Sequence, residues 1–479
     1  MKPAPLAERR RLRVTGVVQG VGFRPFVHGL ACRLELGGFV LNDGDGVVVE
    51  VEGPSRRLDA FAEALRAAAP ALARVDAVAA ETVAARGETA FRIAPSVASG
   101  RTALVPPDVA TCDDCLRELL DPNDRRYRYP FVNCTQCGPR FTIVRNVPYD
   151  RPNTTMAAFP LCADCRREYE DPRDRRFHAE PIACPACGPR LTMPLERAVE
   201  LLLDGAVVAV KGLGGYHLAC DATDERAVAR LRARKHREEK PFALMSPVPE
   251  ELAEVDARER ELLRSRERPI VLLRRRDDAG IASSVAPGSP WVGVMLPYTP
   301  LHHLLCADVA RPLVMTSGNR SDEPIAVADE EARERLGEIA DAFLAHDRPI
   351  HRRCEDSVVR ARFPLRRSRG YAPAALPLPV APPRPLVAVG AELKSTFCVA
   401  RGAEAFLSPH LGDLETELAY RAFTTDLELY LAMLDVAPVL IAHDLHPEYL
   451  ATKWARGREE RDEAELVGVQ HHHAHAAES

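Results

Sequence analysis

The segment CDDCLRELLDPNDRRYRYPFVNCTQCGPRFTI, residues 112–143, is repeated fifty residues later as CADCRREYEDPRDRRFHAEPIACPACGPRLTM, residues 162–193. Each copy holds two Cys-x-x-Cys pairs with 18 residues between them. That spacing is typical of four-thiolate zinc ribbons, in which a complete tetrahedral shell leaves the ion no open position for chemistry. We therefore predict a double zinc-ribbon unit over residues 105–192 that carries two structural Zn²⁺ ions. The predicted ligands are Cys112, Cys115, Cys134, Cys137, Cys162, Cys165, Cys184 and Cys187.

Two properties of this unit have alternative interpretations. The duplication favours ligand pairing within each repeat, and pairing between the repeats is the alternative. The arginines in matching places of both copies could contact nucleic acid, but the aspartates interleaved with them would oppose a phosphate backbone. We therefore expect a structural or docking surface and no nucleic-acid partner.

The composition of the 479-residue chain argues against several classes of protein. Asp and Glu number 69 against 64 Lys and Arg, so the net charge of −5 supplies no general attraction for polyanions. No segment approaches ~18 consecutive apolar residues, and the basic start lacks the apolar core of a secretory signal. We expect a cytoplasmic protein with no membrane partner.

Periodicity outside the cysteine repeats predicts further domains of mixed α+β and α/β class. Residues 8–98 read as strand, helix, strand, strand, helix, strand, which fits a small α+β sandwich. Residues 193–374 alternate helical runs with apolar strands, as in an α/β domain. Prolines concentrated in residues 375–385 indicate a semi-rigid linker. Residues 386–479 then read as a hairpin, an amphipathic helix and a further strand.

A glycine-rich loop near the amino end is the first candidate for chemistry. The segment GVVQGVGFR, residues 16–24, follows a strand and precedes a helical run, so its backbone N–H groups can turn toward an anion. Arg24 at its end has a planar fork that suits two phosphate oxygens. A glycine-rich turn beside a surface arginine is the alternative.

This segment resembles the acylphosphatases, which have a ferredoxin-like fold. The resemblance implies that Arg24 holds the phosphoryl group of an acyl phosphate and that Asn42, in GFVLNDGDGVVVEVEG, orients the attacking water. Hydrolysis would then depend on positioning and electrostatics, without a covalent intermediate. The implied phosphate loop consists of Gln19, Gly20, Val21, Gly22 and Phe23.

Cations and hydroxyl groups within residues 193–374 indicate a polyphosphate site. The run KHREEKPF brings three cations together, and TSGN follows an apolar strand. An exposed helix face is the alternative interpretation of the cations. The motifs GYHLACDATD, KHREEKPFALM and MTSGNRSDEP resemble the YrdC/Sua5 family, which makes carbamoyl-type adenylates from ATP. The resemblance implies that ATP with Mg²⁺ is a substrate, bound by Lys235, Arg237, Lys240, Ser317, Asn319 and Tyr216.

The final segment, VQHHHAHAAES, places His471 and His475 four residues apart. On a helix both imidazoles would face the same way and could bind one metal ion. With VAVGAELKSTFCVA, SPHLGDLET and HDLHPEYLAT, this segment resembles the Kae1-like domain of carbamoyltransferases, an actin/Hsp70-type fold. The resemblance implies a divalent metal held by both histidines and a later aspartate. Because that aspartate is absent from the sequence, we expect residues 386–479 to be only the first part of the domain.

The order of these four modules resembles that of the hydrogenase maturation carbamoyltransferases, the HypF family. The resemblance implies an enzyme that hydrolyses carbamoyl phosphate, joins the carbamate to ATP as carbamoyl adenylate, and transfers carbamoyl to the C-terminal cysteine of a partner protein, HypE. A threonylcarbamoyl-adenylate enzyme of tRNA modification is one alternative, but it needs no acyl phosphate site. A non-catalytic zinc scaffold that binds RNA or protein is the other.

Overall fold

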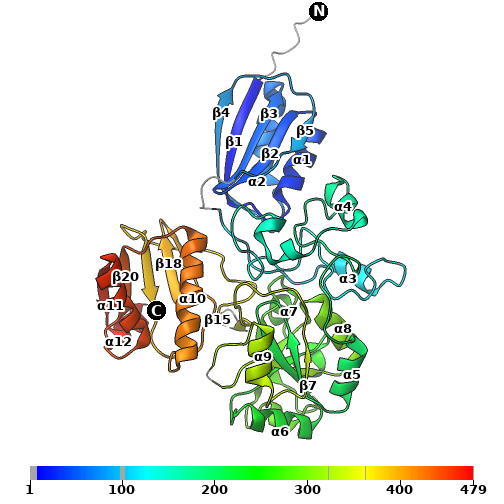
Figure 1. The fold of residues 1–479 in the computed structure, drawn as a ribbon, viewed down its shortest axis with the longest axis vertical. Helices are drawn as coiled ribbons and strands as arrows, with labels where there is room; N and C mark the ends of the chain where they lie inside the picture. Colours follow the sequence, from blue (N-terminus) through cyan, green and yellow to red (C-terminus); the bar gives the residue numbers. More distant parts are fainter. Residues whose placement is uncertain (1–7, 98–102, 322, 362, 478–479) are drawn as a thin grey trace, which may run out of the picture. The chain divides into compact units, whose positions relative to one another are not determined.

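The computed structural model of the chain describes residues 8–97, 103–321, 323–361 and 363–477 (Figure 1). Contacts gather these residues into two compact units. The first unit holds the amino-terminal sheet and Val132–Gly188. The second holds Pro107–Phe131 and nearly all residues from Pro189 onward. The multidomain mixture of α+β and α/β architecture predicted from the sequence is confirmed.

The amino-terminal sheet has five strands in the order β4-β1-β3-β2-β5, with α1 and α2 packed against it and against each other (Figure 1). Alternate residues of β1, such as Leu12 and Val14, enter the core, which is the period-2 pattern of a half-buried strand. The predicted strand and helix order is confirmed, and β5 is an additional strand that pairs parallel with β2. The elements are β1 (Glu8–Val17), α1 (Phe23–Arg33), β2 (Gly37–Asp43), β3 (Gly46–Gly53), α2 (Ser55–Ala67), β4 (Arg74–Val83) and β5 (Phe91–Ile93).

The cysteine repeats contain little regular structure. Each begins with a short helix, α3 (Asp113–Leu120) or α4 (Ala163–Glu170), that starts directly after the first cysteine of its repeat. Two 3₁₀ turns, Arg151–Asn153 and Thr155–Ala158, lie between the repeats. A fold with so few strands and helices needs another source of stability, and bound metal supplies it in small domains of this kind.

A ten-stranded mixed sheet forms the centre of the second unit, in the order β13-β6-β7-β12-β8-β11-β10-β14-β15, with β9 paired to β10. Its strands are β6 (Val208–Lys211), β7 (Tyr216–Asp221), β8 (Ala243–Met245), β9 (Ala253–Glu254), β10 (Ile270–Arg275), β11 (Trp291–Met295), β12 (Leu313–Ser317), β13 (Ala342–Leu344), β14 (Val358–Arg360) and β15 (Phe363–Arg366). Its helices are α5 (Leu195–Leu203), α6 (Glu225–Arg234), α7 (Ala257–Arg264), α8 (Pro300–Val309) and α9 (Asp329–Leu336). The antiparallel pairing of β7 with β12 places Ser317 opposite His217, so the loop after β12 starts beside β7.

A six-stranded sheet in the order β16-β19-β18-β17-β20-β21 follows. The predicted hairpin is formed by β17 and β18, and the predicted amphipathic helix is α10. The proline-rich stretch is not wholly a linker, because β16 lies inside it and pairs with β19. The elements are β16 (Leu376–Pro377), β17 (Leu386–Val389), β18 (Phe397–Arg401), β19 (Glu404–Leu407), α10 (Glu417–Leu434), β20 (Leu440–Asp444), α11 (Leu450–Asp462), β21 (Glu465–Val469) and α12 (His471–Ala477). Within the described residues, none of the helices combines the length and the apolar character that a bilayer crossing requires.

Candidate functional site

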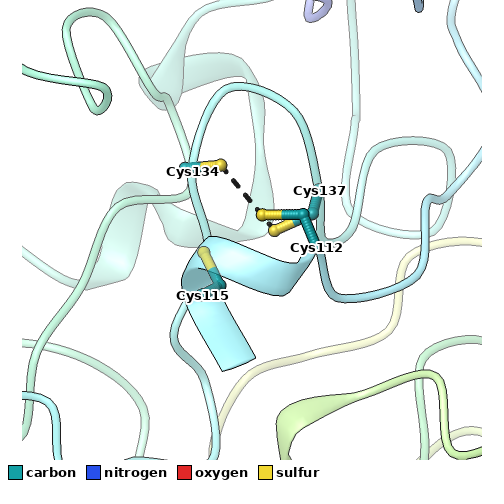
Figure 2. A group of neighbouring side chains, drawn as sticks. All are labelled: Cys112, Cys115, Cys134 and Cys137. Atoms are coloured by element: carbon teal, nitrogen blue, oxygen red, sulfur yellow. Dashed lines mark hydrogen bonds between the residues drawn. The ribbon is translucent and has the colours of Figure 1, made fainter. Parts of the chain in front are cut away.

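The cysteines predicted to bind zinc come together within their own repeats. The sulfur atoms of Cys112, Cys115, Cys134 and Cys137 all lie within 4.8 Å of one another, and so do those of Cys162, Cys165, Cys184 and Cys187. Figure 2 shows the first group, with Cys112 and Cys115 at α3 and the other two on a loop. Of the two pairings that the sequence allowed, the structure therefore has the one within each repeat.

The separations between these sulfur atoms suit zinc. They are 3.9 Å for Cys134 and Cys137, 3.7 Å for Cys162 and Cys184, and 3.8 Å for Cys184 and Cys187. Four thiolates at ~2.3 Å from a tetrahedral ion lie about 3.8 Å apart. The two clusters thus fit two structural zinc ions, and their complete thiolate shells leave no coordination position for a substrate.

Two glycines shape the loop that joins β1 to α1. Gly20 and Gly22 have φ angles of 70° and 74°, in the left-handed region that glycine adopts without steric cost. Gly22 also directly precedes α1, so the loop leads straight into the first helical turn. The N–H groups of a first turn have no partner inside the helix, which makes them available to an anion.

One side chain of the loop and one from outside it hold the loop in this shape. The amide nitrogen of Gln19 donates to two backbone carbonyls around the β2–β3 turn at 2.6 and 2.7 Å, and its oxygen accepts from the Tyr149 N–H at 2.7 Å. Arg140 Nε donates to the Gly20 carbonyl at 2.6 Å. The side chain of Gln19 therefore supports the loop, which leaves the backbone amides and Arg24 as the candidate groups for binding an anion.

Arg24 is the predicted catalytic residue and is 8% exposed. Its Nη2 donates to Glu180 Oε1 at 2.8 Å, and its Nη1 lies 2.9 Å from Asp150 Oδ1 and 3.3 Å from Ser96 Oγ. Asp150 and Glu180 belong to the cysteine-repeat region. Sequence reasoning missed both carboxylates, although Glu180 was visible as a departure from the repeat, which has Pro130 at the matching position.

Asn42, the predicted water-positioning residue, lies with Arg24 in a pocket of about 20 Å³ that the loop glycines also line. Both polar atoms of its side chain are buried, and no described residue hydrogen-bonds them. A buried amide normally has partners, so these atoms are poised for a water or a substrate. A volume of this size suits about one water, and a phosphoryl group requires the lining side chains to move. Arg24 also lines a second cavity, of about 550 Å³, which gives the guanidinium room to shift.

Burial controls the charge states around Arg24. It raises the pKa of Glu180 to about 7, although Arg24 acts in the opposite direction. It lowers the pKa of His178 to about 4, and the positive charge of Arg24 adds to this effect. His178 is therefore neutral at pH 7, while Glu180 is close to its midpoint there.

Three of the predicted nucleotide residues, Lys235, Ser317 and Asn319, meet at the loop after β12. Lys235 is fully buried, and its Nζ donates to the Ser317 carbonyl at 2.7 Å, to Asn319 Oδ1 at 2.5 Å and to the Asn319 carbonyl. Ser317 Oγ donates to Asn319 Oδ1 at 2.7 Å. Burial lowers the pKa of Lys235 to about 7, and Arg237 contributes in the same direction. A lysine held this way orders the loop, and a phosphate would have to replace one of its three acceptors.

The other predicted nucleotide residues are arranged differently. Arg237 donates to the backbone carbonyls of Lys240 and Pro241 at 2.9 and 2.8 Å, which closes the turn after α6. Tyr216 is buried in the sheet core, and its hydroxyl donates to Asp329 at 2.6 Å. Its backbone carbonyl accepts from the Gly318 N–H at 2.7 Å, so Tyr216 meets the loop through its main chain and not through its ring.

A buried polar network beside this loop was not predicted. His217 Nε2 lies 2.8 Å from Asp356 Oδ2, and Arg369 Nε donates to Asp356 Oδ1 at 2.6 Å. The Arg369 guanidinium stands 3.4 Å over the Tyr298 ring. Arg369 and His217 hold the pKa of Asp356 far below its usual value in spite of its burial. Periodicity cannot reveal such a network, because His217 lies on β7 while the other three members lie in loops distant from it in the sequence.

The two histidines of α12 converge, as predicted. Their Nε2 atoms are 3.2 Å apart, and His471 Nδ1 donates to Asp444 Oδ2 at 2.8 Å. Two imidazole nitrogens at ~2.1 Å from one ion lie about 3.0 Å apart at a right angle and about 3.4 Å apart at a tetrahedral angle, so the pair fits a shared metal. Asp444 fixes the His471 tautomer that leaves Nε2 free to coordinate. All three residues line a cavity of about 400 Å³.

Four family models match this chain in succession. The Acylphosphatase model matches residues 10–93, and the HypF finger model matches residues 111–144 and 161–193. The Sua5/YciO/YrdC model, described as telomere recombination, matches residues 200–368. The HypF Kae1-like domain model matches residues 381–478.

Similar proteins match over nearly the whole chain. Carbamoyltransferase HypF2 of Cupriavidus necator is 48% identical over 515 residues, which cover 99% of this chain and 63% of that protein. Carbamoyltransferase HypF of Rhodobacter capsulatus is 50% identical over 489 residues, which cover 98% and 65%. A crystal structure of full-length HypF with phosphate and nucleotide bound superposes with a TM-score of 0.95 at 43% identity, covering 99% of this chain and 64% of that one.

This chain therefore spans about 63% to 65% of the length of these relatives. Within that span the order of modules, both cysteine clusters and the loop before α1 agree with the family that the sequence resembles. Over nearly its whole length the chain is similar to the HypF carbamoyltransferases, both in sequence and in fold.

Proposed function

We propose that this chain hydrolyses carbamoyl phosphate and activates the released carbamate with ATP, as part of a carbamoyltransferase of [NiFe]-hydrogenase maturation. The modules predicted at residues 8–98, 193–374 and 386–479 would carry out hydrolysis, activation and transfer in that order. The zinc unit between the first two would hold the structure together and leave the chemistry to its neighbours.

The observation that carries the proposal is the pairing of Arg24 with Asn42 at one pocket. A guanidinium at a glycine-turned loop can hold a phosphoryl group, and backbone amides of the same loop complete the anion site. The Asn42 amide, to which none of the described residues hydrogen-bonds, can orient a water toward phosphorus. The water oxygen attacks phosphorus, the bond from phosphorus to the carbamate oxygen breaks, and carbamate leaves as an anion. The water's protons pass to the phosphate product and to solvent.

Carbamate would then react with ATP at the loop after β12. Its oxygen attacks the α-phosphorus, carbamoyl adenylate forms, and pyrophosphate leaves. Lys235, Ser317 and Asn319 already contact one another, which supports a common role in ordering the phosphates. Mg²⁺ bound to ATP would neutralise part of the triphosphate charge, as in other nucleotide enzymes.

The last module would bind the carbamoyl adenylate, and the thiol sulfur of the C-terminal cysteine of the partner protein HypE would attack its carbamoyl carbon. The bond between that carbon and the AMP oxygen breaks, AMP leaves, and the thiol proton passes to solvent. His471 and His475 would hold a divalent metal, since their Nε2 atoms are 3.2 Å apart and Asp444 orients the first ring. The metal would supply a positive charge near the adenylate phosphate.

The test is the exchange of labelled pyrophosphate into ATP. We expect exchange that depends on carbamoyl phosphate and is absent with threonine plus bicarbonate in its place. Arg24→Ala should abolish this exchange, because the carbamate supply would be lost. Exchange supported by threonine and bicarbonate alone would contradict the proposal and favour a threonylcarbamoyl-adenylate enzyme.

A further inference from the structure

Arg24 is held by Glu180, a buried carboxylate that also accepts hydrogen bonds from two other residues. Glu180 accepts from Arg24 Nη2 at 2.8 Å, from the Tyr169 hydroxyl at 3.1 Å, and from the Arg151 N–H at 2.9 Å. Its side chain is 2% exposed, whereas that of Asp150, the other carboxylate at Arg24, is 22% exposed. Glu180 is thus the rigid partner of the guanidinium, and Asp150 is the partner that solvent or substrate can reach.

Metal binding does not account for Glu180 or Tyr169. The first repeat has the same cysteines in the same positions, yet it carries Pro130 where the second has Glu180 and Leu119 where the second has Tyr169. Both repeats form a four-cysteine cluster despite this difference. The hydroxyl and the carboxylate therefore serve a purpose specific to the second repeat: Tyr169 donates to Glu180, and Glu180 in turn accepts from Arg24.

Stability does not explain them either. Burying a carboxylate beside a guanidinium costs desolvation energy that the ion pair often fails to recover. The raised pKa of Glu180 is a direct sign of that cost. A buried carboxylate that lowers the stability of the fold and pairs with a catalytic side chain is typical of a functional site.

We propose that Glu180 is a positioning residue of the acyl phosphate site, which holds the Arg24 guanidinium at the phosphate loop. This inference rests on the proposed function, because it assigns Glu180 to the same hydrolysis. The second cysteine repeat thereby completes a site whose loop and asparagine come from the amino-terminal sheet. Asp150 pairs with Arg24 Nη1, the nitrogen that a phosphate oxygen would bind. Glu180 holds Nη2 in place when the phosphate displaces Asp150.

Chemical rescue of Arg24→Ala by methylguanidinium tests this role. If Glu180 defines the guanidinium position, the free ion should bind there and restore hydrolysis of carbamoyl phosphate. Adding Glu180→Gln should raise the half-saturating concentration of methylguanidinium about tenfold or more, because a charged hydrogen bond is lost. The matched control is Glu170→Gln in the same repeat, an exposed carboxylate whose loss should leave the rescue unchanged.

Zinc content and melting temperature are measured on every variant, so that unfolding is not mistaken for lost positioning. If Glu180→Gln fails to fold, Tyr169→Phe replaces it, since that change removes only the hydroxyl that anchors Glu180 and should raise the rescue concentration severalfold. Equal rescue with and without Glu180, or in Tyr169→Phe where that variant is used, overturns the proposal.

If methylguanidinium restores no activity to Arg24→Ala, the kinetics of the single variant Glu180→Gln test the positioning role instead. Positioning predicts a fall in kcat/KM for carbamoyl phosphate of about tenfold or more, with both zinc ions retained. Unchanged kinetics overturn the proposal. Full hydrolysis by Arg24→Ala without any additive would instead remove the proposed function itself.

Discussion

The two cysteine repeats have the same metal-binding framework and different surroundings. In both, a helix starts directly after the first cysteine, and an aspartate pairs with the arginine three residues later, Asp114 with Arg117 and Asp164 with Arg167. The sulfur atoms of each repeat gather into one cluster. Duplication has therefore preserved the parts that the metal needs.

The differences lie at positions that do not bind metal. Arg128 of the first repeat forms a two-point ion pair with Asp308 of α8, at 2.6 and 3.1 Å, whereas His178 at the matching place is neutral and stands near Arg24. Arg140 of the first repeat is buried, and its counterpart Arg190 is exposed. A zinc-held frame tolerates such changes because its stability comes from the ion, and the free positions can then be adapted to different neighbours.

Losing one cluster has the largest expected effect. Cys115→Ser should release the first zinc ion and Cys165→Ser the second, each costing on the order of 10 kcal/mol of metal-binding free energy. Mass spectrometry for metals should find two ions in the native chain and one in each variant. Loss of both ions from either single variant would show that the repeats do not bind metal independently.

The variants Arg140→Ala and Arg190→Ala compare the two repeats at matched positions. Arg140 donates to the carbonyls of Gly20, Cys134, Thr135, Cys137 and Pro139. Its removal leaves buried acceptors unsatisfied and frees the phosphate loop, so we expect a loss of roughly 3–5 kcal/mol and weaker phosphate binding.

Arg190→Ala should change stability by about 0.5 kcal/mol or less, because the side chain is exposed. Urea unfolding and phosphate titration of both variants provide the measurement. Similar losses in the two variants would mean that the repeats have not diverged in this respect.

The pH dependence of Glu180 is a smaller effect with a definite sign. Burial raises its pKa from 4.5 to about 7, and the charged or titratable groups facing it are Arg24, Asp150, Arg151 and Tyr169. A carboxyl group whose pKa is higher in the folded than in the unfolded chain stabilises the fold fully at pH values below its unfolded pKa. That stabilisation is lost as the pH rises through the pKa of the folded state. The native chain should therefore lose up to about 3 kcal/mol relative to Glu180→Gln between pH 4.5 and pH 7.

Melting temperatures of the two proteins across that range check this expectation. His178 also titrates near the lower limit, but it is present in both proteins and cancels in the difference. A constant difference across the range would show that Glu180 is not buried beside Arg24 as described.

The sequence was most informative where chemistry demands a fixed spacing. Eight ligand cysteines, the turn of the phosphate loop and the two histidines four residues apart were all readable, because a tetrahedral ion, a left-handed glycine and a helical turn each restrict which residues can stand where. The strands that became β6, β10 and β12 were readable as apolar runs.

The partners of these groups could not be read in the same way. Arg24 meets Glu180, and His217 meets Asp356, across more than a hundred residues of chain, and no local pattern encodes such contacts. Lys235 was expected to contact phosphate, and nothing in its neighbourhood revealed that its ammonium is enclosed by Ser317 and Asn319. The short strand β16 was missed because prolines argue against a strand, although an edge strand tolerates them.

The most direct measurement is the release of inorganic phosphate from carbamoyl phosphate by the zinc-loaded native chain and by Arg24→Ala. We expect steady release by the native chain and a loss of about 10³-fold or more in the variant, because one guanidinium supplies most of the charge that stabilises the transferring phosphoryl group. The variant should retain both zinc ions. Release at the native rate from a correctly folded Arg24→Ala would contradict the account.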